Sequence, residues 1–159
     1  MVMLIKDIIQ EDFVNYKKKS MFILFPHCTF KCEKECGIQC CQNSPLAKAP
    51  NIEIEIDKIV NMYLNNDITE AFVFGGLEPF DSFDDMYALI KAIRKKTEDD
   101  IVIYTGFDRH EIEQYIILLR QFKNIIIKYG RFKLDDVPHR DEVLGVDLAS
   151  RNQYAERIS

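Results

Sequence analysis

Long apolar runs are absent from the sequence, and this absence limits where the protein can act. No window reaches the roughly 18 uninterrupted apolar residues that a membrane-spanning helix needs. The first 20 residues mix acidic and basic side chains and lack the basic, apolar, small order of a secretory signal. We therefore expect a soluble, cytoplasmic protein with no membrane partner.

An excess of positive charge is also missing. The formal net charge is -5, with 21 Lys and Arg against 26 Asp and Glu. Non-specific affinity for nucleic acid depends on clustered Lys and Arg, and the basic run from Lys17 to Lys19 is short. The sequence therefore predicts no nucleic-acid partner.

Cysteine is confined to one short stretch of the chain. The five cysteines are Cys28, Cys32, Cys36, Cys40 and Cys41. A disulfide framework would spread its cysteines along the chain, whereas an odd number in one local cluster indicates metal or redox chemistry. We call residues 28–43 the cysteine segment.

The remaining sequence has the composition of one globular domain. Apolar residues make up 47% and charged residues 30% of the 159 positions, which is enough for one core. Internal repeats, low-complexity tracts and long linkers are absent. We expect a single domain over residues 1–159.

Apolar runs alternate with helical patterns after the N-terminal segment. The sequence predicts strands over 21–25, 71–74, 101–104 and 125–127, with a fifth over 143–148, and helices over 58–65, 83–96 and 109–122 that Asp57, Ser82 and Asp108 cap. Such alternation is typical of an α/β fold with a parallel sheet. Because a complete eight-fold barrel takes about 250 residues, we expect an incomplete, open arrangement, either an incomplete βα barrel with a mostly parallel sheet or an open sheet.

Cysteine or glycine follows each of the first four predicted strands. The cysteine segment follows the first strand, Gly75 and Gly76 the second, Gly106 the third and Gly130 the fourth. Ligands and catalytic groups gather at the carboxyl ends of the strands in such folds. We expect the functional site at this edge of the sheet.

The spacing of the cysteines limits how they can bind a metal. Cys28, Cys32, Cys36 and Cys40 would share one face of a helix, but the first and last would stand about 18 Å apart along its axis. At most three can then bind one cluster, unless the segment is a loop. Thiolates hold iron–sulfur clusters or zinc, and a three-ligand site leaves one metal ion open to substrate. The cysteines alone leave iron–sulfur and zinc equally open.

The first two cysteines carry a family resemblance. Cys28-Thr-Phe-Lys-Cys32 resembles the first half of C-x3-C-x2-C, the signature that radical S-adenosylmethionine enzymes carry after their first strand. The third cysteine departs from this spacing, so Cys36, Cys40 and Cys41 are the candidates. In activating proteins of anaerobic (class III) ribonucleotide reductase, one variable residue and then Asn follow the last cysteine. Cys41-Gln-Asn43 resembles this pattern, so Cys41 is preferred and Cys36 and Cys40 are alternates.

The resemblance to these activating proteins extends along most of the chain. Residues 12–15 (DFVN) and 75–79 (GGLEP) resemble their DFVN and TGGDP or TGGEP motifs, with Leu77 where the family has a second glycine. Three further motifs follow in the family's order: 104–107 (YTGF, like YTGY), 129–132 (YGRF, like DGxF) and 150–153 (SRNQ, like GSxNQ).

This resemblance implies a radical reaction. In the family, three cysteinates hold a 4Fe-4S cluster, here by Cys28, Cys32 and Cys41, and the fourth iron binds the amino and carboxylate groups of S-adenosylmethionine. An electron from the cluster splits the sulfonium into methionine and a 5′-deoxyadenosyl radical. The implied substrate is a glycine Cα of the large catalytic subunit of anaerobic ribonucleotide reductase, and the implied electron donor is a flavodoxin or ferredoxin.

The resemblance also implies contacts to S-adenosylmethionine. The turn Gly75-Gly76-Leu77-Glu78 would lie against the methionine amino group, and Thr105 and Gly106 would line the adenosine side. Phe30 and Asn43 of the cysteine segment complete the implied cofactor-binding set.

Two other functions are compatible with the sequence. The chain could activate a different glycyl-radical enzyme or act on a small molecule. Alternatively, the cysteines could bind structural zinc in a non-enzymatic binding module.

For the radical enzyme, we expect an open active-site rim that another protein closes.

Overall fold

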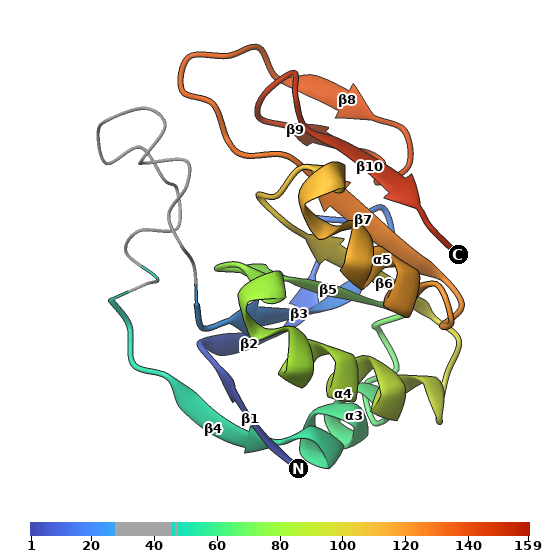
Figure 1. Ribbon diagram of the computed structural model, residues 1–159. Helices are drawn as coiled ribbons and strands as arrows, with labels where there is room; N and C mark the ends of the chain where they lie inside the picture. Colours follow the sequence, from blue (N-terminus) through green and yellow to red (C-terminus); the bar gives the residue numbers. More distant parts are fainter. Residues whose placement is uncertain (28–45, 47) are drawn as a thin grey trace.

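The computed structural model describes residues 1–27, 46 and 48–159 (Figure 1). The predicted site residues of the cysteine segment lie outside these described residues: Cys28, Phe30, Cys32, Cys36, Cys40, Cys41 and Asn43. The other predicted site residues, from Gly75 to Gly106, are all described.

A six-stranded sheet forms the centre of the fold, in the order β10-β7-β6-β5-β3-β2. Its inner strands are parallel, and they are β3 (Ser20–Phe25), β5 (Ala71–Gly76), β6 (Asp100–Tyr104) and β7 (Ile125–Tyr129). Antiparallel strands form the two edges, β2 (Asp7–Asp12) and β10 (Tyr154–Arg157). The inner strands are almost fully buried, as parallel strands covered on both faces usually are.

Helices cover one face of this sheet (Figure 1). α3 (Ile56–Leu64) precedes β5, α4 (Phe83–Arg94) connects β5 to β6, and α5 (Glu113–Leu119) connects β6 to β7. Two short 3-10 helices, η1 (Pro79–Ser82) and η2 (Arg109–Ile112), lead into α4 and α5. Their apolar side chains form one core with alternate residues of the strands.

A hairpin and the segment before β3 cover the opposite face. β8 (His139–Asp141) and β9 (Val146–Leu148) form the hairpin. Apart from this cover, β1 (Val2–Ile5) and β4 (Ile52–Glu55) form a separate two-stranded sheet. Tyr16, Leu144 and Leu148 pack against Val73 and Val102 of the inner strands. The sheet is therefore covered on both faces.

The predicted α/β class and parallel inner strands are confirmed. Each of the four predicted strands lies within β3, β5, β6 or β7. The finer expectation of an incomplete barrel is not confirmed, because the sheet is open, and the described residues form no closed barrel. Within the same residues, no helix is long and apolar enough to cross a membrane.

Several local expectations are wrong. The helix predicted over 58–65 begins earlier, at Ile56, and Glu55 rather than Asp57 occupies its N-cap. The fifth strand predicted over 143–148 is shorter and lies in the hairpin, outside the central sheet.

The helix starts at Ser82 and Asp108 differ in their capping. Ser82 precedes α4 but its side chain makes no capping hydrogen bond. Asp108 and Glu111 form a capping box, although the helix predicted over 109–122 consists of η2 followed by α5.

Candidate functional site

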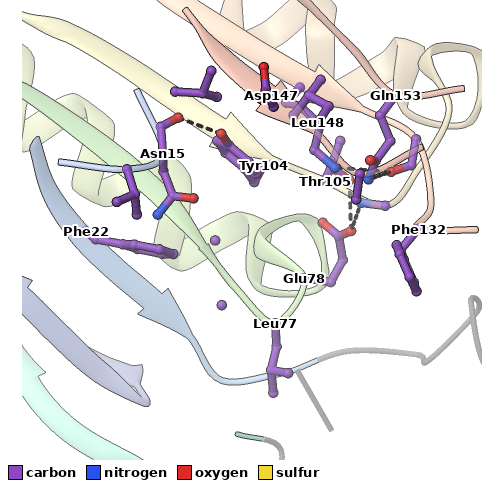
Figure 2. Close-up of a pocket in the computed structure, with 18 residues that line it drawn as sticks. Asn15, Phe22, Leu77, Glu78, Tyr104, Thr105, Phe132, Asp147, Leu148 and Gln153 are labelled. Carbon is purple, nitrogen blue, oxygen red and sulfur yellow. Dashed lines mark hydrogen bonds between the residues drawn. The ribbon is translucent and has the colours of Figure 1, made fainter. Parts of the chain in front are cut away.

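The carboxyl ends of the inner strands border a cavity of about 340 Å³ (Figure 2). It lies on the face that the hairpin covers, and its volume is within the range of about 300 to 1,000 Å³ for small-molecule sites. All described residues of the predicted cofactor-binding set line it: Gly75, Gly76, Leu77, Glu78, Thr105 and Gly106. The fold thus brings the second and third predicted loops together.

The turn from Gly75 to Glu78, which we call the glycine turn, lies beyond the last residue of β5 that pairs with β6. Pairing between β5 and β6 ends at Phe74 and Ile103, whereas pairing with β3 continues to Gly76. Gly76 has a positive φ of 79°, and a Cβ there would lie 2.9 Å from Leu24 Cα. Only glycine fits this position without strain, and it leaves backbone exposed to the cavity.

Leu77, which replaces the family's second glycine, is compatible with this turn. Its side chain is buried and points away from Thr105 and Gln153 (Figure 2). Its backbone N–H donates to Phe25 O at 3.4 Å. The larger side chain therefore leaves the cavity between β5 and β6 open.

Glu78 joins the turns that follow β5 and β6. Its Oε1 accepts hydrogen bonds from Thr105 Oγ1 and Gly106 N, both at 2.8 Å (Figure 2). Its Oε2 accepts a hydrogen bond from Phe80 N at 3.0 Å. The residue is only 6% exposed. Burial raises the pKa of its carboxyl to about 7, against the lowering effect of these three donors.

His27, the last residue before the cysteine segment, is bonded to the same turn. Glu78 N donates to His27 O at 2.5 Å, and His27 directly precedes Cys28. The chain therefore enters the cysteine segment beside the cavity. No group of three or more His, Cys, Asp and Glu among the described residues could hold a metal ion. The cysteines remain the candidate ligands.

Lys128 and Tyr104 line the cavity without having been predicted. They are neighbours across β7 and β6. Lys128 is 6% exposed, and its Nζ donates to Gly130 O at 3.1 Å and lies 5.4 Å from the centre of the Tyr104 ring. Tyr104 OH donates to Asn15 O at 2.5 Å, and burial raises the pKa of Tyr104 above its usual range. A single Lys within the apolar run 125–129 is the sequence signal that could have indicated this position.

The YGRF and SRNQ motifs fold against each other. Gly130 has a φ of 102°, and a Cβ there would lie 2.9 Å from Asn152 O. Asn152 Nδ2 donates to Arg131 O at 2.8 Å, and Gln153 Nε2 donates to Gly130 O at 3.3 Å. Gln153 also lines the cavity. Motifs from two distant parts of the chain therefore close one side of the site.

Comparison with known proteins identifies the class of this protein. The family model for the 4Fe-4S single cluster domain matches residues 18–153, which is most of the chain. The chain therefore belongs to the 4Fe-4S single cluster domain family, which supports the predicted iron–sulfur class. No curated protein and no solved structure matches the chain.

The geometry of Gly76 leads to a stability prediction. Gly76→Ala should lower the free energy of unfolding by about 2 kcal/mol, because a non-glycine residue is strained at positive φ. Gly106→Ala is the matched control, since its Cβ would lie 3.7 Å from the nearest side-chain atom. The control should change stability by less than about 0.5 kcal/mol. Urea unfolding followed by circular dichroism measures both, and equal effects would contradict the prediction.

The buried carboxyl of Glu78 leads to a pH prediction. Its pKa is raised from the ordinary 4.5 to about 7, so the folded protein retains this proton over a range in which the unfolded chain has lost it. The contribution of Glu78 to stability is therefore fully present below pH 4.5 and is lost as pH rises to about 7. At 1.36 kcal/mol per pKa unit, the decline is about 3 kcal/mol. Unfolding measured across this range should show a steeper decline for the native protein than for Glu78→Gln; parallel curves would refute it.

Proposed function

We propose that this protein is a radical S-adenosylmethionine enzyme that generates a glycyl radical on anaerobic ribonucleotide reductase. One observation carries the proposal. Every described residue that the resemblance assigns to S-adenosylmethionine lines one cavity, and the chain enters the cysteine segment beside it. Membership of a 4Fe-4S family supports the cluster that such a reaction needs.

Three cysteines are the proposed cluster ligands, namely Cys28, Cys32 and Cys41, with Cys36 and Cys40 as alternates. Three thiolates leave one iron open to the cosubstrate. A reduced cluster held by these cysteines would supply the electron for cleavage of S-adenosylmethionine, and the resulting radical would take a hydrogen atom from a glycine Cα. The protein contributes by binding, orienting and shielding the reactants.

The cavity offers groups that match the cosubstrate. The backbone of Gly75 and Gly76 suits the N–H groups of the methionine amino group, because carbonyl oxygens accept hydrogen bonds and glycine permits close approach. Thr105 and Gly106 line the adenosine side, and the buried Lys128 adds a donor farther along the sheet. Phe22 and Leu148 contribute apolar walls to the site.

A protein substrate suits the border of this cavity. Val14 lines it, and Val14 and Phe13 are 72% and 60% exposed. Exposed apolar side chains beside a site are typical of surfaces that contact another protein. The large catalytic subunit of anaerobic ribonucleotide reductase is the proposed partner, and a flavodoxin or ferredoxin the proposed electron donor.

The cluster assignment predicts the metal content of variants. Anaerobic reconstitution should give about four irons and four sulfides per chain. Cys28→Ala and Cys32→Ala should each abolish the cluster, because each removes a required thiolate. Iron, sulfide and visible absorption measure this outcome. Stoichiometric zinc without iron uptake would contradict it.

The same assay identifies the third ligand. Cys41→Ala should lose the cluster as Cys28→Ala does, whereas Cys36→Ala and Cys40→Ala should retain it and still cleave S-adenosylmethionine. A cluster that survives without Cys41 but not without Cys36 would reverse the assignment.

The proposed reaction has a direct spectroscopic test. The reduced protein should cleave S-adenosylmethionine slowly alone and, with the reductase subunit, yield a glycyl radical doublet by electron paramagnetic resonance. Replacement of the acceptor glycine of the subunit by alanine is the control and should remove the doublet. No doublet with this subunit, but one on another glycyl-radical enzyme or efficient modification of a small metabolite, would refute the choice of substrate.

A further inference from the structure

The carboxylate of Glu78 is already committed to groups of the protein. A carboxylate offers about four lone-pair sites, and donors of the neighbouring turns occupy three of those of Glu78. These donors are the side chain of Thr105 and the backbone of Gly106 and Phe80, at 2.8 to 3.0 Å. Direct binding of the cosubstrate amino group would have to use the remaining site or break one of these bonds.

Glu78 bridges a gap that the sheet leaves open. The ladder between β5 and β6 ends at Phe74 and Ile103, so strand pairing does not fix the two turns beyond it. Thr105 and Gly106 form the turn that follows β6, which we call the β6 turn. Thr105 N donates to Lys128 O at 2.9 Å, and this bond holds the β6 turn to β7. Hydrogen bonds from Thr105 and Gly106 to Glu78 supply the corresponding link to β5. The width of the cavity between these turns therefore depends on Glu78.

The glycine turn has acceptors of its own. Gly75 and Gly76 continue along the side of β5 that β6 no longer covers, and both line the cavity. Backbone carbonyl oxygens accept hydrogen bonds from amino groups, and glycine permits close contact.

We infer that Glu78 is a positioning residue: through Thr105 and Gly106 it fixes the β6 turn against the glycine turn, and it does not itself contact the amino group of the cosubstrate. This inference rests on the proposed function. It assigns Thr105 a role in holding Glu78, in addition to lining the adenosine side.

Two ligands separate positioning from direct contact. Equilibrium dialysis of the anaerobically reconstituted protein measures binding of S-adenosylmethionine and of its analogue without the α-amino group. If Glu78 acts by positioning, Glu78→Gln should weaken both ligands by a similar factor, about tenfold, the loss expected from one hydrogen bond to a charged group. If Glu78 instead contacts the α-amino group, Glu78→Gln should weaken the binding of S-adenosylmethionine only.

Thr105 provides the second arm of the experiment. Thr105→Val removes the hydroxyl that bonds to Glu78 but leaves the carboxylate, and it should also weaken both ligands about tenfold. Thr105→Ser should restore binding, and the double variant Glu78→Gln with Thr105→Val should lose little more than either single variant. Thr69→Val is the matched control, because the buried Thr69 Oγ1 has no hydrogen-bond partner among the described residues and lies near the opposite end of β5. It should bind both ligands as the native protein does.

The outcomes distinguish this inference from the proposed function. Iron content and circular dichroism identify variants that fail to assemble, and the two-ligand comparison of Glu78→Gln decides the question if Thr105→Val does not fold. The inference alone is overturned if the native protein binds S-adenosylmethionine and Glu78→Gln weakens the binding of that ligand only. It is also overturned if Thr105→Val binds both ligands as tightly as Thr69→Val does. A reconstituted native protein that binds no S-adenosylmethionine overturns both.

Discussion

Beyond the last pair of the β5–β6 ladder, the buried carboxylate of Glu78 joins the two turns that border the cavity. Its three hydrogen bonds oppose the desolvation that raises its pKa. The backbone N–H of the same residue donates to His27 O, directly before the cysteine segment. One residue thus relates the glycine turn, the β6 turn and the approach to the proposed cluster. A change at Glu78 should therefore alter the site through its geometry as well as its charge.

The parallel sheet explains why Glu78 can contact segments that are far apart in the sequence. Neighbouring parallel strands end at the same edge, so segments far apart in sequence meet there. The inner strands β3, β5, β6 and β7 direct their following loops to this edge, and the SRNQ motif returns to pack against Gly130. The proposed radical chemistry needs this enclosure, because a reactive carbon radical must meet its target in a site that excludes competing reactions.

The sequence predicts the parts of the fold that carry continuous apolar runs or helical apolar patterns. The four inner strands are continuous apolar runs, and their loops carry the glycines that proved to line the cavity. The edge strands were not predicted, because β2 (DIIQED) and β10 (YAER) are partly exposed and mix charged with apolar residues. Lys128 was also missed, since its proximity to Tyr104 depends on the β6–β7 register. The hydrogen bonds of Glu78 likewise require the turns to be placed in three dimensions.

The central claim is that cluster and S-adenosylmethionine share one site at the carboxyl edge of the sheet. Electron–nuclear double resonance on the reduced protein tests it most directly, with S-adenosylmethionine labelled with ¹⁵N at the methionine amino group. The account predicts a hyperfine coupling between this nitrogen and the cluster, because in the proposed function the amino group would bind the open iron. A protein that contains the intact cluster and binds S-adenosylmethionine, yet shows no coupling, would contradict it.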